Sequence, residues 1–220
     1  MLFSQEEYAR LHSIVFRDDY PGYKPSVREA PNGDGKIDAT KRYAHVALKY
    51  LHKAGACTSF DDWCFLFRCL SRAHREAERV AVKLGVPEQY LPHEMDATLR
   101  VLEYPPGAGS ELHTDFDLFT LLCYRNTMPG DDSPLIFMCN EGEQENSREW
   151  RKLQRTSPGM HLGEIGELVG LGKATPHYVL PEHETQHSIV YFAIPDHAAV
   201  LPSQVTVGDW IKERIARSRY

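Results

Sequence analysis

The spacing of two histidines and one aspartate constrains the fold of this 220-residue chain more than any other feature. His113 and Asp115 stand two positions apart, and His177 follows far downstream. Side chains two residues apart on a β-strand point to the same face, so one strand end can direct His113 and Asp115 into one cavity. The third side chain must come from a distant strand that the fold brings alongside. Three ligands on one face of a metal ion leave its other face open, which suits Fe(II) that takes up several ligands.

The His-x-Asp motif by itself is weakly specific. The chain contains 11 histidines and 31 acidic residues, so such pairs arise by chance. A single histidine of this kind is more often solvated or hydrogen-bonded than a ligand. The interpretation therefore depends on the sequence around it.

Four ordered motifs surround these residues: Tyr104-Pro-Pro, His113-Thr-Asp followed by Thr120-Leu-Leu, Thr-Pro-His177-Tyr-Val, and Ser188-Ile-Val-Tyr-Phe. Their order and rough spacing resemble the isopenicillin N synthase-like branch of the Fe(II)/2-oxoglutarate dioxygenases, over about residues 95 to 202. The resemblance implies a mainly β fold with flanking helices, a double-stranded β-helix or distorted jelly roll. It also implies iron held by His113, Asp115 and His177.

The resemblance further implies that 2-oxoglutarate and O2 act as cosubstrates, with Tyr104 and Ser188 hydrogen-bonding the carboxylates of the oxo acid. The expected reaction oxidises an aliphatic C–H of a small molecule, by hydroxylation, desaturation or ring closure. Asp115 argues against halogenation, because halogenases of this chemistry replace the carboxylate ligand with a small residue.

The main departure from the family pattern is Gln186, which stands where the family has an arginine that pairs with a carboxylate. A neutral amide offers at best an ordinary hydrogen bond, a loss of ~1 to 2 kcal/mol. Arg100, Arg125 and Lys173 are candidates for a relocated cation, and we include Gln186 and Arg100 among the expected cosubstrate residues. A second departure, Tyr178 after the third ligand, is expected to repack the outer face.

Three other functions stay open at this point. One is an iron oxidase of the same family that does not use 2-oxoglutarate, which the missing arginine favours. Another is a zinc hydrolase, since catalytic zinc also takes three protein ligands and a water, although no motif supplies its general base. The third is a non-catalytic jelly-roll binding module, because a fold alone does not fix a function.

Composition excludes several classes of protein. The chain is 42% apolar and 25% charged, as in ordinary globular proteins, and its net charge of −6 argues against a nucleic-acid partner. Five cysteines without a CxxC pair are typical of a reducing compartment. No secretory signal or long apolar run is visible, so we expect a cytoplasmic protein without membrane contact. The expected partner is a small-molecule substrate, an amino acid or a natural-product intermediate.

Hydrophobic periodicity predicts one domain over residues 1–220: a mainly helical support (1–94), a jelly-roll core (95–202) and a C-terminal helix (203–220). Trp63, Phe65 and Phe67 are expected to pack on the barrel, and Asp209 to cap the last helix. Residues 140–151 are predicted to form a solvated loop or short helix, with a lid as the alternative. The EF-hand-like stretch 32–38 lacks suitable ligands at Ala30 and Lys41, so we do not expect calcium. Helices are predicted at 4–16, from about 40 to Gly55, and at 61–84, and strands at 97–104, 119–124, 135–139, beside His177 and at 188–194.

Overall fold

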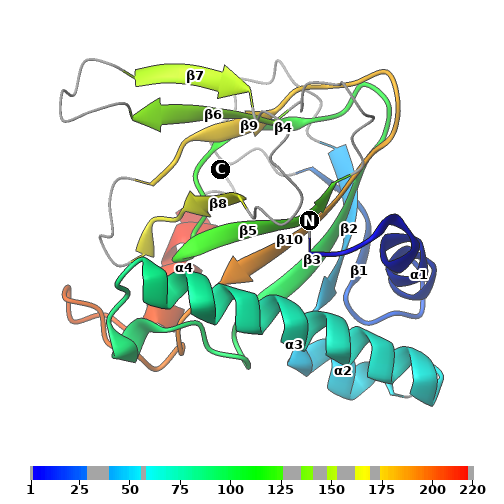
Figure 1. Cartoon of the computed structure of the whole chain (residues 1–220), viewed down its shortest axis with the longest axis horizontal. Helices are drawn as coiled ribbons and strands as arrows, with labels where there is room; N and C mark the ends of the chain where they lie inside the picture. The colour runs from blue at the N-terminus through cyan, green and yellow to red at the C-terminus, as the bar shows by residue number, and fades with distance from the viewer. Residues whose placement is uncertain are drawn as a thin grey trace.

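Two antiparallel sheets form the centre of the structure, a computed structural model that describes residues 2–28, 40–55, 58–125, 135–140, 148–152, 162–168 and 174–217. The larger sheet has the order β1-β2-β3-β10-β5-β8, and the smaller has the order β4-β9-β6-β7. Figure 1 shows the smaller sheet lying over one face of the larger one. This arrangement is the double-stranded β-helix, or distorted jelly roll, that the sequence predicts.

The strands are short, as this fold requires. In the larger sheet they are β1 (Tyr23–Arg28), β2 (Thr40–Val46), β3 (Thr98–Tyr104), β5 (Phe119–Arg125), β8 (Leu162–Ile165) and β10 (Gln186–Ala193). In the smaller sheet they are β4 (Ser110–His113), β6 (Leu135–Asn140), β7 (Arg148–Lys152) and β9 (His177–Val179).

The helices are α1 (Gln5–Val15), α2 (Leu48–Ala54), α3 (Phe60–Lys83) and α4 (Val207–Arg217), with a 3-10 turn at Glu88–Tyr90. A capping box between Ser4 and Glu7 begins α1, and the Ser59 side chain caps α3. In Figure 1, α3 runs along the face of the larger sheet that is turned away from the smaller sheet.

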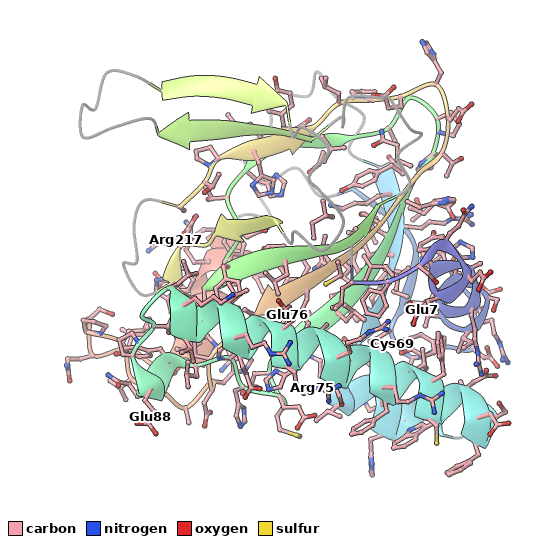
Figure 2. All side chains as sticks on the ribbon, in the orientation of Figure 1. Glu7, Cys69, Arg75, Glu76, Glu88 and Arg217 are labelled. Carbon is pink, nitrogen blue, oxygen red and sulfur yellow. The ribbon has the colours of Figure 1, made fainter. Side chains whose placement is uncertain are left out.

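One stripe of α3 is buried against the larger sheet. Leu66, Leu70, Ala73 and Ala77 are 0 to 1% exposed and share one core cluster with strand residues such as Tyr191. Burying each leucine contributes ~1.5 to 3 kcal/mol, so this stripe holds the helix in place. Figure 2 marks Cys69, which is buried on this helix, and Arg75, which is exposed.

The opposite face of the larger sheet looks toward the smaller sheet and carries a second, smaller apolar cluster. Its buried members are Tyr43, Leu102, Tyr104, Ala108 and Val179. Because side chains alternate along a strand, Leu102 and Tyr104 point inward while Leu99 and Val101 join the outer core. The expected cosubstrate residues Tyr104, Gln186 and Ser188 belong to this inner face, whereas His113 and His177 lie on the smaller sheet.

The helix predicted from about residue 40 to Gly55 is wrong in its first half and right in its second half, where α2 has Gly55 as its C-cap. Residues 40–46 form β2, which pairs with β1 on one side and β3 on the other, and the helix α2 begins only at Leu48. The support before residue 95 therefore adds two strands to the sheet. The apolar positions fit a helical period, but pairing with two distant strands fixes the extended conformation instead.

Two further expectations need correction. Residues 148–152 of the predicted loop form β7, with Met138 opposite Trp150, while residues 141–147 lie outside the described residues. The backbone N–H of Asp209 donates to the Thr206 hydroxyl at 3.1 Å, so Thr206 and not Asp209 caps α4. The EF-hand-like stretch also lies outside the described residues.

Of the three aromatic side chains expected to pack on the barrel, Phe65 and Phe67 belong to the core that includes its strands, and Trp63 instead contacts Phe67 and α2. Phe65 is 8% exposed, Phe67 packs on the same core, and Trp63 stacks on Phe67 while its indole N–H donates to the carbonyl of Leu51. The cysteines recorded there as free thiols are Cys64, Cys69 and Cys123. Among the described helices, none has the length and apolar character needed to cross a bilayer.

Candidate metal centre

His113 and His177 stand opposite each other on neighbouring strands. His113 ends β4, His177 begins β9, and the two residues are register partners in the smaller sheet. Their ring centroids are 4.2 Å apart. This pairing explains how two histidines far apart in sequence come together.

Backbone carbonyls fix the orientation of both imidazoles. Nδ1 of His113 lies 2.7 Å from the carbonyl oxygen of Glu111, and Nδ1 of His177 lies 3.0 Å from that of Thr175. A carbonyl oxygen only accepts, so each Nδ1 carries the proton and each Nε2 is the unprotonated nitrogen. Metal-binding histidines are commonly oriented in this way.

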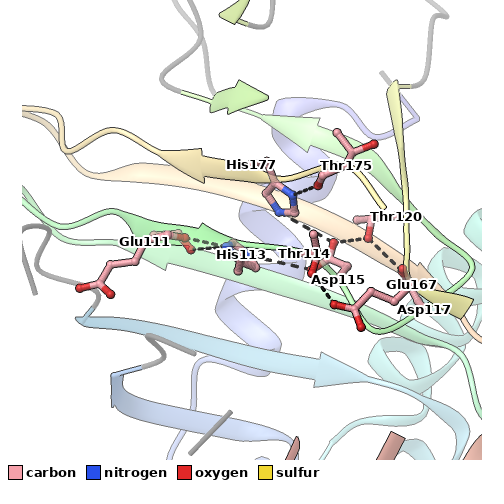
Figure 3. A network of polar contacts seen from close by, with 10 residues as sticks. Glu111, His113, Thr114, Asp115, Asp117, Thr120, Glu167, Thr175 and His177 are labelled. Carbon is pink, nitrogen blue, oxygen red and sulfur yellow. Dashed lines mark hydrogen bonds and ion pairs between the residues drawn. The ribbon is translucent and has the colours of Figure 1, made fainter. Parts of the chain in front are cut away.

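Asp115 completes the cluster from the turn that follows β4. Its Oδ1 lies 3.8 Å from Nε2 of His113, and its Oδ2 lies 4.0 Å from Nε2 of His177. One donor atom from each of the three residues lies within 4.8 Å of the others (Figure 3). These donor atoms fit a single divalent ion bound by two imidazoles and a carboxylate.

The carboxylate of Asp115 is held from the larger sheet. The hydroxyl of Thr120 on β5 donates to Oδ2 of Asp115 and also lies 2.9 Å from Oδ2 of the buried Asp117 (Figure 3). On the backbone, the N–H of Glu167 donates to the carbonyl of Asp115 at 3.0 Å. The turn is therefore fixed at both its side chain and its main chain.

Electrostatics place the cluster in the protonation state that a metal needs. Burial lowers the pKa of His113 to about 4, and the charges of His177 and Lys41 act in the same direction. Burial by itself raises the pKa of the Asp115 carboxyl, but His177, His113 and the hydrogen bond from Thr120 hold that pKa below its ordinary value. At neutral pH the first group is a neutral imidazole and the second a carboxylate, so neither must lose a proton before binding a cation.

The expected cosubstrate residues all belong to the larger sheet. Gln186 on β10 is the register partner of Tyr104 on β3, and Ser188 is the partner of Leu102. The side-chain amide of Gln186 donates to the carbonyl of Leu180 at 2.9 Å. Tyr104, Gln186 and Ser188 are 7 to 8% exposed, so the structure gathers them on one buried surface.

Arg100 also lies on this inner face, enclosed by aromatic rings. Its guanidinium carbon is 4.6 Å from the ring centroid of Tyr43 and 4.7 Å from that of Phe192. Its charge also helps to lower the pKa of the Asp115 carboxyl, after burial (which raises it), the two histidines and Thr120. The backbone of Arg125 pairs with Ser188, but its side chain and the whole of Lys173 lie outside what the structure describes.

The sequence reasoning missed two contributors. Lys41 is 5% exposed on β2, and its ammonium nitrogen lies 5.6 Å from the ring centroid of Tyr104. Glu167 accepts hydrogen bonds from Thr114 and Arg214 beside the turn that carries Asp115. The Lys-x-Tyr-x-His alternation from residue 41 to 45 indicates a strand and could have revealed Lys41, whereas no local pattern marks Glu167.

A second cluster of metal-binding residue types lies at His93, Asp96 and Asp196. Nδ1 of His93 is 2.8 Å from Asp96, and the backbone N–H of His197 donates to the same carboxylate at 3.1 Å. These contacts give the cluster a structural role at the surface.

Comparisons with solved structures agree with the fold. A full-length protein from Neurospora crassa, crystallised in complex with alpha-KG, superposes with a TM-score of 0.64 and 15% identity, covering 96% of this chain and 80% of that one. A putative oxygenase from Shewanella oneidensis gives a TM-score of 0.64 and 17% identity over 96% of this chain and 84% of its own. The rice dioxygenase for auxin oxidation gives 0.58 and 15% identity over 97% and 82%. No protein-family model and no curated sequence matches this chain.

Proposed function

We propose that this protein is a non-heme Fe(II)-dependent oxygenase that uses O2 and 2-oxoglutarate to oxidise an aliphatic C–H of a small molecule. The observation that carries the proposal is the convergence of His113, Asp115 and His177, whose donor atoms lie within 4.8 Å of one another between the two sheets. The ligand set is the one found in Fe(II) oxygenases with open coordination positions. Solved oxygenases of the same fold support this proposal.

Bound Fe(II) supplies activation of O2 coupled to oxidative decarboxylation of the oxo acid. The residues of the chain position this chemistry. His113 and His177 present their Nε2 lone pairs because their Nδ1 protons are donated to carbonyls. Thr120 keeps the Asp115 carboxylate turned toward the histidines, so that the three residues together would hold the ion.

The cosubstrate surface in this proposal consists of Tyr104, Ser188, Gln186 and Arg100. The hydroxyl groups of Tyr104 and Ser188 can donate to carboxylate oxygens, and the amide of Gln186 can do so only in place of its bond to Leu180. Arg100 contributes positive charge near Asp115. Burial strengthens each of these polar contacts with a bound carboxylate.

We further propose that the substrate is a small molecule, an amino acid or a natural-product intermediate. Structures of the Neurospora crassa protein include complexes with thymine and with 5-formyluracil, so this fold accommodates small molecules in that protein. The four sequence motifs resemble those of the isopenicillin N synthase-like branch, and we assign the chain to that branch as part of the proposal.

An anaerobic titration with Fe(II) tests this function. Adding 2-oxoglutarate to the Fe(II) protein is expected to produce the weak visible charge-transfer band of the chelate. Asp115→Ala should abolish both iron binding and the band, because two imidazoles alone hold the ion poorly. Asp18→Ala changes an exposed aspartate on the surface and serves as the matched control. Unchanged iron affinity in Asp115→Ala contradicts the site.

The iron oxidase that does not use 2-oxoglutarate is the second candidate. It is favoured by Gln186, a neutral residue whose amide is bonded to Leu180. Measured succinate release decides between the two functions. One succinate per O2 consumed supports the dioxygenase, and O2 consumption without succinate supports the oxidase.

A further inference from the structure

At the position where the family has an arginine, this chain has Gln186, whose side chain is neutral. Gln186 is 7% exposed, and its amide is directed to the carbonyl of Leu180. The distal carboxylate of a bound 2-oxoglutarate would therefore be buried beside a neutral group. Burying an ion without a partner of opposite charge is costly, so a dicarboxylate would need another cation nearby.

Lys41 lies in the same row of the larger sheet as Gln186. Gln186 is opposite Tyr104 on β3, and Arg42 on β2 is opposite Glu103. The preceding residue, Lys41, therefore lies on the other flank of Tyr104. Three neighbouring strands thus place Lys41, Tyr104 and Gln186 side by side.

Contacts and burial show that the Lys41 side chain is on the inner face. Its ammonium nitrogen lies 5.6 Å from the ring centroid of Tyr104, and both residues are at most 7% exposed. Lysine is seldom buried to this extent. Its charge also reaches the metal cluster: after burial and His177, Lys41 contributes to the lowered pKa of His113.

Arg100 is a second inner-face cation near the cluster, and its setting is different. Its guanidinium lies between Tyr43 and Phe192, and it is opposite Val190, four residues along β10 from Gln186. Its electrostatic influence is on Asp115. An oxo acid that chelates a metal uses oxygens of its 1-carboxylate and 2-oxo groups, so its distal carboxylate is left to find a partner beyond the metal ligands.

We propose that Lys41 replaces the missing arginine and binds the distal carboxylate of 2-oxoglutarate, together with Tyr104. In this proposal, the positive charge that the family places on β10 is instead on β2, in the same row of residues across the sheet. This inference rests on the proposed function, because it assumes that the oxo acid binds at the metal.

The test compares two oxo acids in the anaerobic Fe(II) protein, using the charge-transfer band to measure Kd. 2-Oxoglutarate carries the distal carboxylate and 2-oxobutyrate does not. Lys41→Gln should raise the Kd of 2-oxoglutarate by at least ~10-fold, because a charge-assisted bond is lost. The Kd of 2-oxobutyrate, which lacks the carboxylate that the lysine binds, should stay within about twofold.

Rescue variants separate charge from structure. Lys41→Arg should retain tight binding of 2-oxoglutarate, and Gln186→Arg added to Lys41→Gln should restore it by returning the cation to β10. If Lys41→Gln does not fold, Lys41→Met, which keeps the apolar stem, replaces it in the same comparison.

Each outcome decides the assignment. Unchanged 2-oxoglutarate affinity in the Lys41 variants, or equal weakening of both oxo acids, overturns the role of Lys41 and leaves the proposed function standing. Absence of the band in the unmodified protein with either oxo acid overturns the proposed function and this inference together.

Discussion

Glu167 and Arg214 meet at 2.6 Å and thereby join the C-terminal helix to the turn that carries Asp115. The same carboxylate oxygen of Glu167 accepts from the hydroxyl of Thr114, and the Arg214 guanidinium lies 5.0 Å from the ring centroid of Phe116. Both side chains of the pair are less than one-third exposed. The helix that the sequence predicts as a packed terminus therefore also supports the turn that carries the candidate ligand Asp115.

Arg214→Ala should weaken Fe(II) binding, because Glu167 loses the partner that holds it beside Thr114. We expect about a 3- to 10-fold rise in Kd, below the ~10- to 100-fold effect of removing a group bonded directly to a ligand. Anaerobic Fe(II) titration measures it. Arg217→Ala is the control, since Arg217 is on the same helix and pairs with the exposed Glu213. Equal affinity in both variants would show that α4 has no influence on the site.

Thr120→Val should reduce Fe(II) affinity by ~10- to 100-fold, because the valine cannot donate to Asp115. The change keeps the shape of the side chain on β5, so the fold is expected to persist. Thr120→Ser returns the hydroxyl and should recover most of the affinity, as measured by the same titration. Failure of the serine variant to recover it would mean that packing, rather than the hydrogen bond, orients the carboxylate.

Gly166→Ala should destabilise the turn, because a Cβ at Gly166 would lie 2.1 Å from the carbonyl oxygen of Asp117. We expect a loss of ~1 to 3 kcal/mol in the free energy of unfolding, as for other overpacked sites, and weaker iron binding. Urea denaturation and Fe(II) titration measure the two effects. At Gly55 the nearest atom would be 4.0 Å away, so Gly55→Ala should leave both quantities nearly unchanged.

Glu103→Gln should destabilise the attachment of α1 to the sheet in a pH-dependent way. Burial raises the pKa of Glu103, but hydrogen bonds from His12 and Arg42 outweigh it and hold the pKa below its ordinary value of 4.5. The carboxylate therefore contributes stability above pH 4.5, and this contribution is lost as the pH falls through the folded-state pKa. The difference in unfolding free energy between wild type and variant should be largest near neutral pH and shrink below pH 4.5. A difference that is constant with pH would contradict the ionic role of Glu103.

Local patterns predicted the parts of the fold in which alternation and turn residues agree. The strands containing Tyr104, Thr120 and Ser188 lie close to their expected bounds, since each combines β-branched or aromatic residues with flanking turns. The strand from residue 40 to 46 was mistaken for a helix because Tyr43, Val46 and Ala47 satisfy a helical period. Pairing with β1 and β3 determines that this segment is a strand. Such pairing with distant strands has no signature in the local sequence.

The candidate site was predictable only where its residues fall in short sequence motifs. The His-x-Asp pair and the distant His177 point to a shared ion, and the structure brings their donor atoms together. Lys41 and Glu167 depend on contacts across many residues of sequence. Lys41 reaches the site through its place beside Tyr104, and Glu167 through the ion pair with Arg214.

The two histidines belong to the smaller sheet, whereas Asp115 is bonded to Thr120 on the larger one. A ferrous ion bound at this point would link the two sheets, and its binding free energy would add to the stability of the fold. A metal-free molecule would then be less stable than the metal-bound one, and its two sheets would separate first at the end that carries these three residues.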